Sequence, residues 1–225
     1  MLNKLKNLLK IIKNFSEKKE NTIYIQSQEQ QKSESIFDIT STMYDSLKED
    51  VIRFEIGTDI IEFANEISFV IGLIRETLKR KTGFILPPVH YFDNMRLQEN
   101  EIKVYLNGNE LYSKFLIPVQ EEIEKEIEDI LYDLFRNHLK EIFTNESVER
   151  YIDAVKKYNN KLSADIVYNL SSIEIKYILI ELLKNGKSIK NITYVFEMIS
   201  EQIFMGKPEN KNKLIELSEQ VIKNI

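Results

Sequence analysis

The chain has 225 residues, of which 43% are apolar and 30% are charged, and its formal net charge is −5. This is the balance of an ordinary globular protein that buries a core without disulfides or a structural metal. The sequence contains no cysteine, which excludes structural disulfides and Cys-based zinc or thiol chemistry. The acidic balance argues against broad nucleic-acid binding, so we expect no nucleic-acid partner.

The beginning of the chain is basic and amphipathic. Residues 2–15 place apolar side chains at helical spacing and fill much of the remainder with lysine and asparagine. The pattern predicts an amphipathic basic helix over residues 1–15 that contacts a membrane surface or a partner helix. A helix docked on its own domain and a disordered tail are the alternatives. The candidate contact residues are Leu2, Lys4, Leu5, Lys6, Leu9, Lys10, Ile12 and Lys13.

A polar stretch follows this segment. Residues 16–49 begin with a run rich in Gln, Glu, Ser and Lys and end with only a weak helical pattern, which predicts a linker and a weak helix. The sequence has neither a small-residue cleavage site nor a run of about 18 to 20 apolar residues. We therefore expect a cytoplasmic protein whose basic helix would allow peripheral contact with the inner face of the membrane.

Residues 50–118 are predicted to form a small α+β subdomain. Residues 50–57 alternate apolar and polar side chains and end at a glycine, as a half-buried strand does. Residues 65–83 carry apolar side chains at helical spacing and end in basic residues followed by glycine, which indicates a helix. Further along, the pair Asn107 and Gly108 lies between two short strand-like runs and predicts a hairpin turn.

A proline pair interrupts the apolar sequence "GFILPPVHYFDN", which begins at Gly83. Pro87 and Pro88 cannot donate a backbone hydrogen bond, which argues against a helix or a central strand at these positions. Each proline also pushes the residue before it toward extended geometry. The stretch is therefore predicted to form a strand, a stiff crossing, a second strand and a turn at Asp93 and Asn94.

The sequence changes character after Pro118. No proline follows until Pro208, and helical periodicity dominates, which predicts an all-α region over residues 119–225. The acids between residues 121 and 133 flank an apolar stripe and are predicted to be the solvated face of a helix, or else a docking face for a basic partner. The predicted helices span about 119–143, 146–158, 171–184, 188–204 and 211–224.

Several uncommon elements occur in order after residue 49. The strand "DVIRFEIG" is followed by a helix containing Ile-Arg, by Gly-Phe-x-x-Pro-Pro-Val, by Asp-Asn and by Leu-x-x-Asn-Glu. Together they resemble the cytoplasmic part of the FlhA/InvA (FHIPEP) family, the export-gate proteins of flagellar and virulence-type type III secretion. A weaker resemblance covers residues 171–201. The residues that carry the first match are Asp50, Glu55, Gly57, Arg75, Gly83, Phe84, Pro87, Pro88, Asp93, Asn94, Asn100 and Glu101.

The resemblance implies a non-enzymatic protein–protein interaction component of a type III protein export apparatus, with no cofactor. Its implied partners are other export-apparatus proteins, export substrates or chaperones. Full members of the family work as cytoplasmic rings, so the resemblance also implies a homo-oligomer.

Two departures from the family pattern accompany the resemblance. Full members carry about eight membrane-spanning helices before this region, and a small inserted subdomain follows their hairpin. In this sequence Pro118 leads directly into the acidic stretch that begins at residue 119. The sequence is therefore interpreted as a reduced, free-standing relative, to which the family's chaperone-docking cleft cannot be transferred.

Other functions are compatible with parts of the sequence. Residues 171–204 can be interpreted as the helix-turn-helix of a DNA-binding regulator, but the second helix offers few polar side chains for reading bases. A metal-dependent hydrolase would need converging acids, and His90 and His138 lie far apart without a metal-binding spacing. A remnant without secretion activity is a further interpretation, because a shared fold does not prove a retained function.

Overall fold

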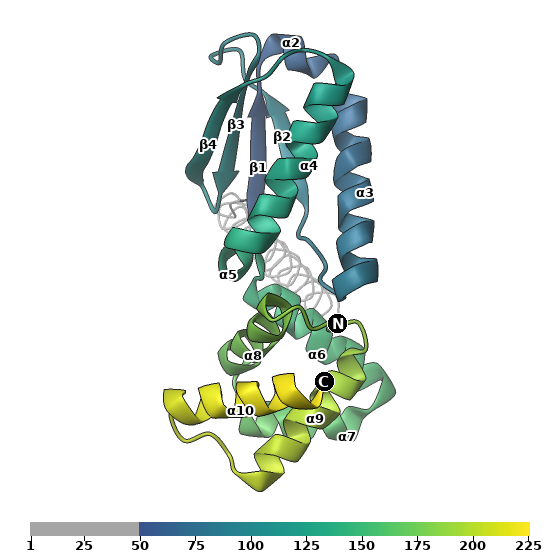
Figure 1. The fold of residues 1–225 in the computed structure, drawn as a ribbon, viewed down its shortest axis with the longest axis vertical. Coiled ribbons are helices and arrows are strands. Elements are labelled where there is room, and N and C mark those ends of the chain that lie inside the picture. Colours follow the sequence, from purple (N-terminus) through teal and green to yellow (C-terminus); the bar gives the residue numbers. More distant parts are fainter. Residues whose placement is uncertain (1–49) are drawn as a thin grey trace, which may run out of the picture. The chain divides into compact units, whose positions relative to one another are not determined.

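Residues 50–225 are described by a computed structural model, and the predictions for residues 1–15 and 16–49 lie outside them. The described residues contain a four-stranded sheet followed by a succession of helices (Figure 1). This arrangement confirms the predicted α+β class. No helix in this part of the chain combines the length and the apolar character that crossing a bilayer requires.

The sheet has the strand order β2-β1-β3-β4. Its strands are β1 (Ile52–Ile56), β2 (Val89–Asp93), β3 (Glu101–Leu106) and β4 (Asn109–Phe115). β1 and β2 are parallel, and they are joined through α2 (Thr58–Ile61) and α3 (Ala64–Thr82), because parallel neighbours need a crossover connection. β3 pairs antiparallel with both β1 and β4.

One face of the sheet is covered by helices and the other is not covered by any described element. Ile52, Phe54 and Ile56 of β1 are buried, whereas Arg53 and Glu55 on the opposite face are only partly covered, as the alternation predicted. The buried face packs against α3 and α4 (Gln120–Asn137), which also pack against each other (Figure 1).

Two tight turns have the backbone conformation that the sequence predicted. The β3–β4 hairpin turns at Asn107 and Gly108, whose φ angles are 49° and 78°. These positive angles explain why an Asn-Gly pair occupies the turn. α3 ends at Gly83, which adopts a left-handed conformation with φ 80°.

The helical part continues from α4 to the end of the chain. Its remaining elements are α5 (Leu139–Ile142), α6 (Asn145–Tyr158), α7 (Asn160–Asn169), α8 (Ser172–Lys184), α9 (Ile192–Met205) and α10 (Lys211–Asn224). Each helix from α6 to α10 begins after a Ser, Thr or Asn whose side chain accepts a hydrogen bond from a backbone amide of the first turn. Such caps replace the intrahelical partners that the first amides lack.

Some predicted elements are wrong. The strand predicted before the proline pair is absent, because residues 84–86 pair with no strand. The helix predicted over 119–143 is broken at His138, whose φ of −118° is not helical. The helix predicted from residue 188 begins at Ile192, since Asn191 and not an earlier residue caps it. The short helix α2 and the whole of α7 were not predicted.

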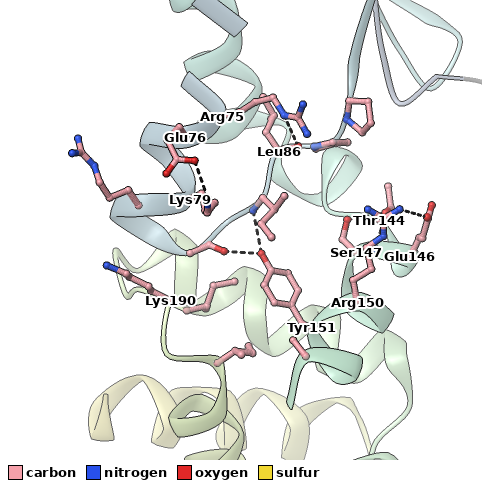
Figure 2. A pocket seen from close by; sticks show the side chains of 18 of the residues that line it. Arg75, Glu76, Lys79, Leu86, Thr144, Glu146, Ser147, Arg150, Tyr151 and Lys190 are labelled. Atoms are coloured by element: carbon pink, nitrogen blue, oxygen red, sulfur yellow. Dashed lines mark hydrogen bonds and ion pairs between the residues drawn. The ribbon is translucent and has the colours of Figure 1, made fainter. Parts of the chain in front are cut away.

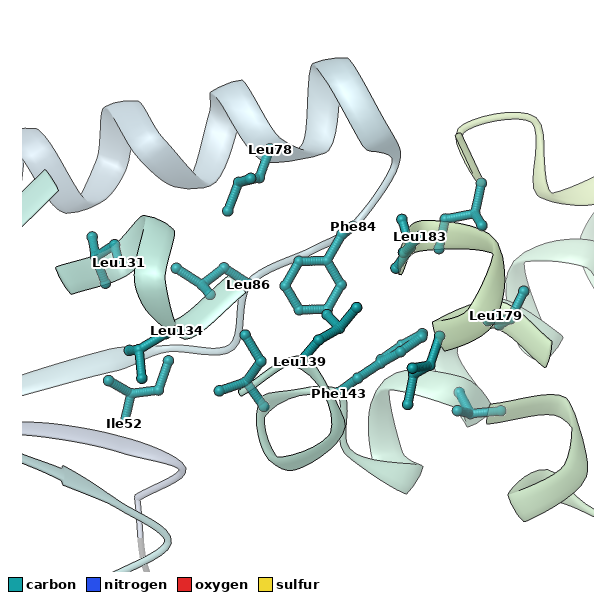
Figure 3. Close-up of a cluster of buried hydrophobic side chains, with 14 of the residues drawn as sticks. Ile52, Leu78, Phe84, Leu86, Leu131, Leu134, Leu139, Phe143, Leu179 and Leu183 are labelled. Carbon is teal, nitrogen blue, oxygen red and sulfur yellow. The ribbon is translucent and has the colours of Figure 1, made fainter. Parts of the chain in front are cut away.

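Phe84 lies at the centre of the core (Figure 3). Its ring is fully buried and contacts Phe135 of α4 and Phe143, with 5.4 Å between ring centroids in both pairs. The Phe143 contact is edge-to-face, an arrangement that adds to the energy of burial. One cluster of buried side chains extends from the sheet to α10, so both predicted parts, 50–118 and 119–225, contribute to the same core.

The glycine at the end of α3 yields a test of this packing. A Cβ at position 83 would lie 2.3 Å from the Lys190 backbone nitrogen, whereas a Cβ at Gly72, inside α3, meets nothing within 4 Å. We expect Gly83→Ala to lower the free energy of unfolding by about 3 kcal/mol, because it adds a clash to a strained φ. Gly72→Ala should raise it by up to about 1 kcal/mol. Urea unfolding of both variants checks this, and equal effects would contradict the packing.

Candidate functional site

Residues 83–88 cross from the end of α3 to the start of β2 and form one wall of a cavity of about 570 Å³ (Figure 2). The other walls are the last turns of α3, the first turns of α6 and residues 189–192. The cavity therefore lies where the sheet-bearing part of the fold meets the helical part. Its apolar lining comes from Val51, Ile85, Leu86, Pro87, Pro88, Tyr151, Ala154, Ile189 and Ile192.

The Tyr151 side chain of α6 holds this wall in place. Its hydroxyl donates a hydrogen bond of 2.7 Å to the Gly83 carbonyl and accepts one of 3.1 Å from the Ile85 amide (Figure 2). On the other side, Arg75 Nε donates to the Leu86 carbonyl at 3.2 Å. These side-chain bonds satisfy backbone groups that a strand ladder would otherwise satisfy. They explain how the crossing is fixed although it belongs to no strand.

Burial raises the pKa of Tyr151 to about 12. The hydroxyl therefore keeps its proton across the physiological range and remains a donor to Gly83. A backbone hydrogen bond from Ile85 acts in the opposite direction and is the smaller effect.

The cavity is positively charged. Its lining contains five cationic side chains and two carboxylates. Glu76 pairs with Lys79 at 2.8 Å, and Glu146 pairs with Arg150 at 2.7 Å. The cations without a carboxylate partner among residues 50–225 are Arg75, Arg80 and Lys190. Thr144 and Ser147 from the start of α6 also line the cavity, and the positive end of a helix dipole favours negative charge.

This arrangement suits binding. A cavity with an apolar lining and cationic side chains around it suits an anionic group carried on an apolar body. Among residues 50–225, no three His, Cys, Asp or Glu side chains come together to hold a metal ion. His90 pairs with Asp50 at 2.5 Å at one edge of the sheet, and His138 lies 4.0 Å from Glu141 at the break between α4 and α5.

The structure brings part of the predicted signature to this cavity. Arg75, Gly83, Pro87 and Pro88 line it, and Phe84 lies directly behind the crossing in the core. The motif thus has three structural roles. Gly83 ends α3, Phe84 is buried in the core, and Pro87 and Pro88 line the cavity.

The remaining signature residues lie away from the cavity, and most of them shape the sheet and its loops. Asn94 Nδ2 donates to the Glu55 carboxylate at 2.8 Å, which ties the turn after β2 to β1. A Cβ at Gly57 would lie 2.1 Å from the Gln98 carbonyl, so this loop requires glycine. Asp50 pairs with His90, and Asp93 is the last residue of β2.

Asn100 and Glu101 fix the connection that leads into β3. Asn100 Nδ2 donates to the Leu116 carbonyl at 3.0 Å. The Glu101 carboxylate accepts hydrogen bonds from the Gln98 amide and the Ser113 hydroxyl, and these bonds lower its pKa. Both residues therefore serve the fold at the end of the sheet opposite the hairpin.

Sequence reasoning missed Tyr151, Arg150 and Arg80. Tyr151 is 68 positions from the Gly83 carbonyl that it binds, so no local pattern joins them. The sequence carried only a weak indication of this role. Tyr151 lies on the apolar stripe of α6, and a tyrosine hydroxyl that becomes buried needs a hydrogen-bond partner.

The FHIPEP family model matches residues 3–121 and 121–225. Because the match covers nearly the whole sequence, the chain belongs to the FHIPEP family, as the resemblance of its motifs predicted. The two matched stretches meet at residue 121, directly after the connection that follows β4.

Individual relatives agree with this assignment. The flagellar biosynthesis protein FlhA of Borreliella burgdorferi is 24% identical over 201 residues, which covers 68% of this chain and 29% of that protein. The chain thus spans less than a third of this curated relative.

Solved structures share the fold. The Chlamydia pneumoniae CdsV and CdsO protein complex contains a chain with a TM-score of 0.64 and 14% identity, covering 76% of this chain and 68% of that one. Nonameric EPEC SctV-C gives a TM-score of 0.63 and 15% identity, with coverage of 78% and 65%.

Removal of the Tyr151 hydroxyl, which bonds to Gly83 and Ile85, is expected to lower the stability of the fold and to change how that stability depends on pH. Tyr151→Phe should lower the free energy of unfolding at pH 7 by about 1–3 kcal/mol, because it leaves two backbone groups unpaired. Since the pKa rises from its ordinary value of 10.0 to about 12 on folding, the hydroxyl stabilises the fold below pH 10. That contribution is lost as the pH rises from 10 to 12.

Urea unfolding at pH 7 and pH 11 measures both effects. The difference in the free energy of unfolding between wild type and Tyr151→Phe should be about 1 kcal/mol smaller at pH 11 than at pH 7. Tyr112, whose pKa burial also raises to about 12, is present in both proteins and cancels from the difference. A gap that stays constant or widens would contradict a buried, bonded hydroxyl.

Proposed function

We propose that this chain is a protein–protein interaction component of a type III protein export apparatus, of either the flagellar or the virulence type. The observation that supports this most strongly is the family match on both sides of residue 121, together with the fold of residues 50–225. The chain works by docking and performs no catalysis, and it needs no cofactor.

Its partners are other export-apparatus proteins, export substrates or chaperones, and further copies of the chain. The structural neighbours support this proposal, since CdsV is described in a complex with CdsO and SctV-C is described as nonameric. The chain acts in the cytoplasm, where residues 1–15 provide peripheral contact with the inner face of the membrane. Six lysines within residues 1–20 favour this contact, each contributing about 1 kcal/mol near an anionic surface.

The cavity beside the proline crossing is the proposed docking site for one of these partners. Its unpaired cations, Arg80 and Lys190, are exposed at the rim, and Arg75 lies deeper against the crossing. A partner segment that combines acidic and apolar side chains matches this lining. The rigid wall lowers the entropic cost of binding because it does not have to be ordered on contact.

No observation favours the DNA-binding alternative. α9, the helix that would read the major groove, buries Val195, Phe196 and Ile199 in the core. Its exposed side chains include Glu197 and Glu201, which phosphates would repel.

A cross-linked pull-down from the native cell, read by mass spectrometry, tests the export proposal. We expect the full chain to recover export-gate, ATPase-complex or secreted proteins. Arg80→Glu with Lys190→Glu should lose at least one of these partners, because it reverses the charge at the cavity rim. Lys156→Glu with Lys157→Glu, at exposed positions of α6 outside the cavity, is the control with the same change in net charge.

The outcomes separate the two parts of the proposal. Recovery of no secretion protein by any version would reject the export function. Equal recovery by the cavity variant and the control would retain the export function but reject the cavity as the docking site.

A further inference from the structure

The outer edge of β2 has backbone groups that can pair with a further strand. Within residues 50–225, β2 pairs with β1 alone. Successive backbone amides of a strand point to alternate edges. The Asn94 amide, directly after β2, donates to the Ile56 carbonyl of β1 at 3.0 Å. The amides and carbonyls of Val89, Tyr91 and Asp93 therefore point away from β1, and none of them bonds to another backbone group of residues 50–225.

The β2 edge lacks the lysines, prolines and bulges that usually protect edge strands. Residues Val89–Asp93 contain no lysine and no proline, and their pairing with β1 is regular along all five residues. The opposite edge of the sheet differs, because β4 contains Lys114 and its register with β3 shifts between Val104 and Tyr105. Of the two edges, that of β2 is therefore the one suited to strand addition.

Both faces of the sheet leave room beside β2 for the side chains of an added strand. On the uncovered face, Phe92 is 51% exposed. On the other face, α3 runs beside β2 (Figure 1), and the Ser68 hydroxyl bonds to the Tyr91 hydroxyl at 2.8 Å. Gly72 lies one turn further along the same side of α3, where an added Cβ meets nothing within 4 Å. A segment with β-branched side chains fits such an edge.

The edge leads into the cavity. Pro88 lines the cavity and directly precedes Val89, the first residue of β2. A chain that pairs with β2 and continues past Val89 therefore enters the cavity, whose cations without a carboxylate partner among residues 50–225 are Arg75, Arg80 and Lys190. An extended chain advances about 3.3 Å per residue, so a segment of about ten residues spans β2 and reaches into the cavity.

We propose that an extended segment of an export partner adds to β2 as a fifth strand, with acidic residues at the end that enters the cavity. Its backbone pairs with the outward amides and carbonyls of β2, and its carboxylates meet the cavity cations. Main-chain pairing supplies affinity, and the charged end supplies specificity. The proposal rests on the docking role proposed for the cavity, and it adds the conformation of the docked segment and a second surface that the segment contacts.

Amide hydrogen exchange of the full chain, measured by NMR with a synthetic peptide, tests the proposal. The probe has a central run of alternating Thr and Val and two Glu residues at each end, so that it can pair in either direction. At saturating peptide, we expect the amides of Tyr91 and Asp93 to exchange at least about tenfold more slowly, because they become hydrogen-bonded.

The β4 edge supplies a control within the same molecule. The Leu116 amide, directly after β4, donates to the Asn100 carbonyl at 2.8 Å. By the same alternation, the amides of Ser113 and Phe115 point away from β3, and their exchange should not change. A peptide N-methylated at every Thr and Val keeps its side chains and charge but cannot donate to β2. In fluorescence anisotropy it should bind at least about tenfold more weakly than the unmodified peptide.

The cavity end of the segment is tested with the charge variants of the cavity rim. Arg80→Glu with Lys190→Glu should weaken binding of the unmodified peptide, whereas Lys156→Glu with Lys157→Glu, outside the cavity, should leave it close to that of the wild type. If the rim variant loses the peptide but the peptide does not slow exchange at the β2 edge of the wild type, docking in the cavity is retained and strand addition is rejected.

Several other results would overturn the proposal. They are equal protection of the β2 and β4 edges, equal binding of the methylated and unmodified peptides, equal binding by the rim variant and its control, or no binding of the peptide. Slow exchange at Tyr91 and Asp93 in the free chain would show that the edge is already covered. If that slow exchange depended on protein concentration, a second copy of the chain would be what covers it.

Discussion

The bonds of the Tyr151 hydroxyl to Gly83 and Ile85 are the interaction on which the described fold depends most directly. They attach α6, in the helical part, to the segment that connects α3 with β2. The same point receives a third segment, because the Ile189 amide donates to the Thr82 carbonyl at 2.7 Å. Only glycine permits this approach, since the backbone of residues 189 and 190 occupies the space of a side chain at position 83. The geometry of the cavity follows from this junction.

The proline pair has its explanation in the same junction. A segment that crosses between two parts of a fold has backbone groups that no neighbouring strand satisfies. Pro87 and Pro88 have no backbone N–H, so two fewer donors need a hydrogen-bond partner. Buried and exposed side chains alternate along this segment, and each kind has its own role. Phe84 and Leu86 are fully buried in the core, while Ile85 is half exposed and lines the cavity. A motif that fixes the fold thereby also builds a binding wall.

Features set by neighbours in sequence were predictable, and features set by distant contacts were not. The alternation of β1, the periodicity of α3 and the Asn107 and Gly108 turn each depend on a few adjacent residues, and all three were predicted correctly. The break at His138 was missed because apolar periodicity continues through it. The late start of α9 is an exception, because it is set locally: Asn191, and not Ser188, caps the helix. The cavity was beyond prediction because its cations come from α3, α6 and the loop before α9.

The net charge of −5 conceals two surfaces of opposite sign on one folded unit. The cavity gathers cations that have no carboxylate partner among residues 50–225, whereas the exposed side of α4 carries several carboxylates. The cavity combines its charge with an apolar lining, so charge would select a partner and apolar contact would retain it. At physiological salt, exposed charges more than about 8 Å apart are largely screened, so the local charge of the cavity, and not the net charge of the chain, decides which groups the cavity attracts.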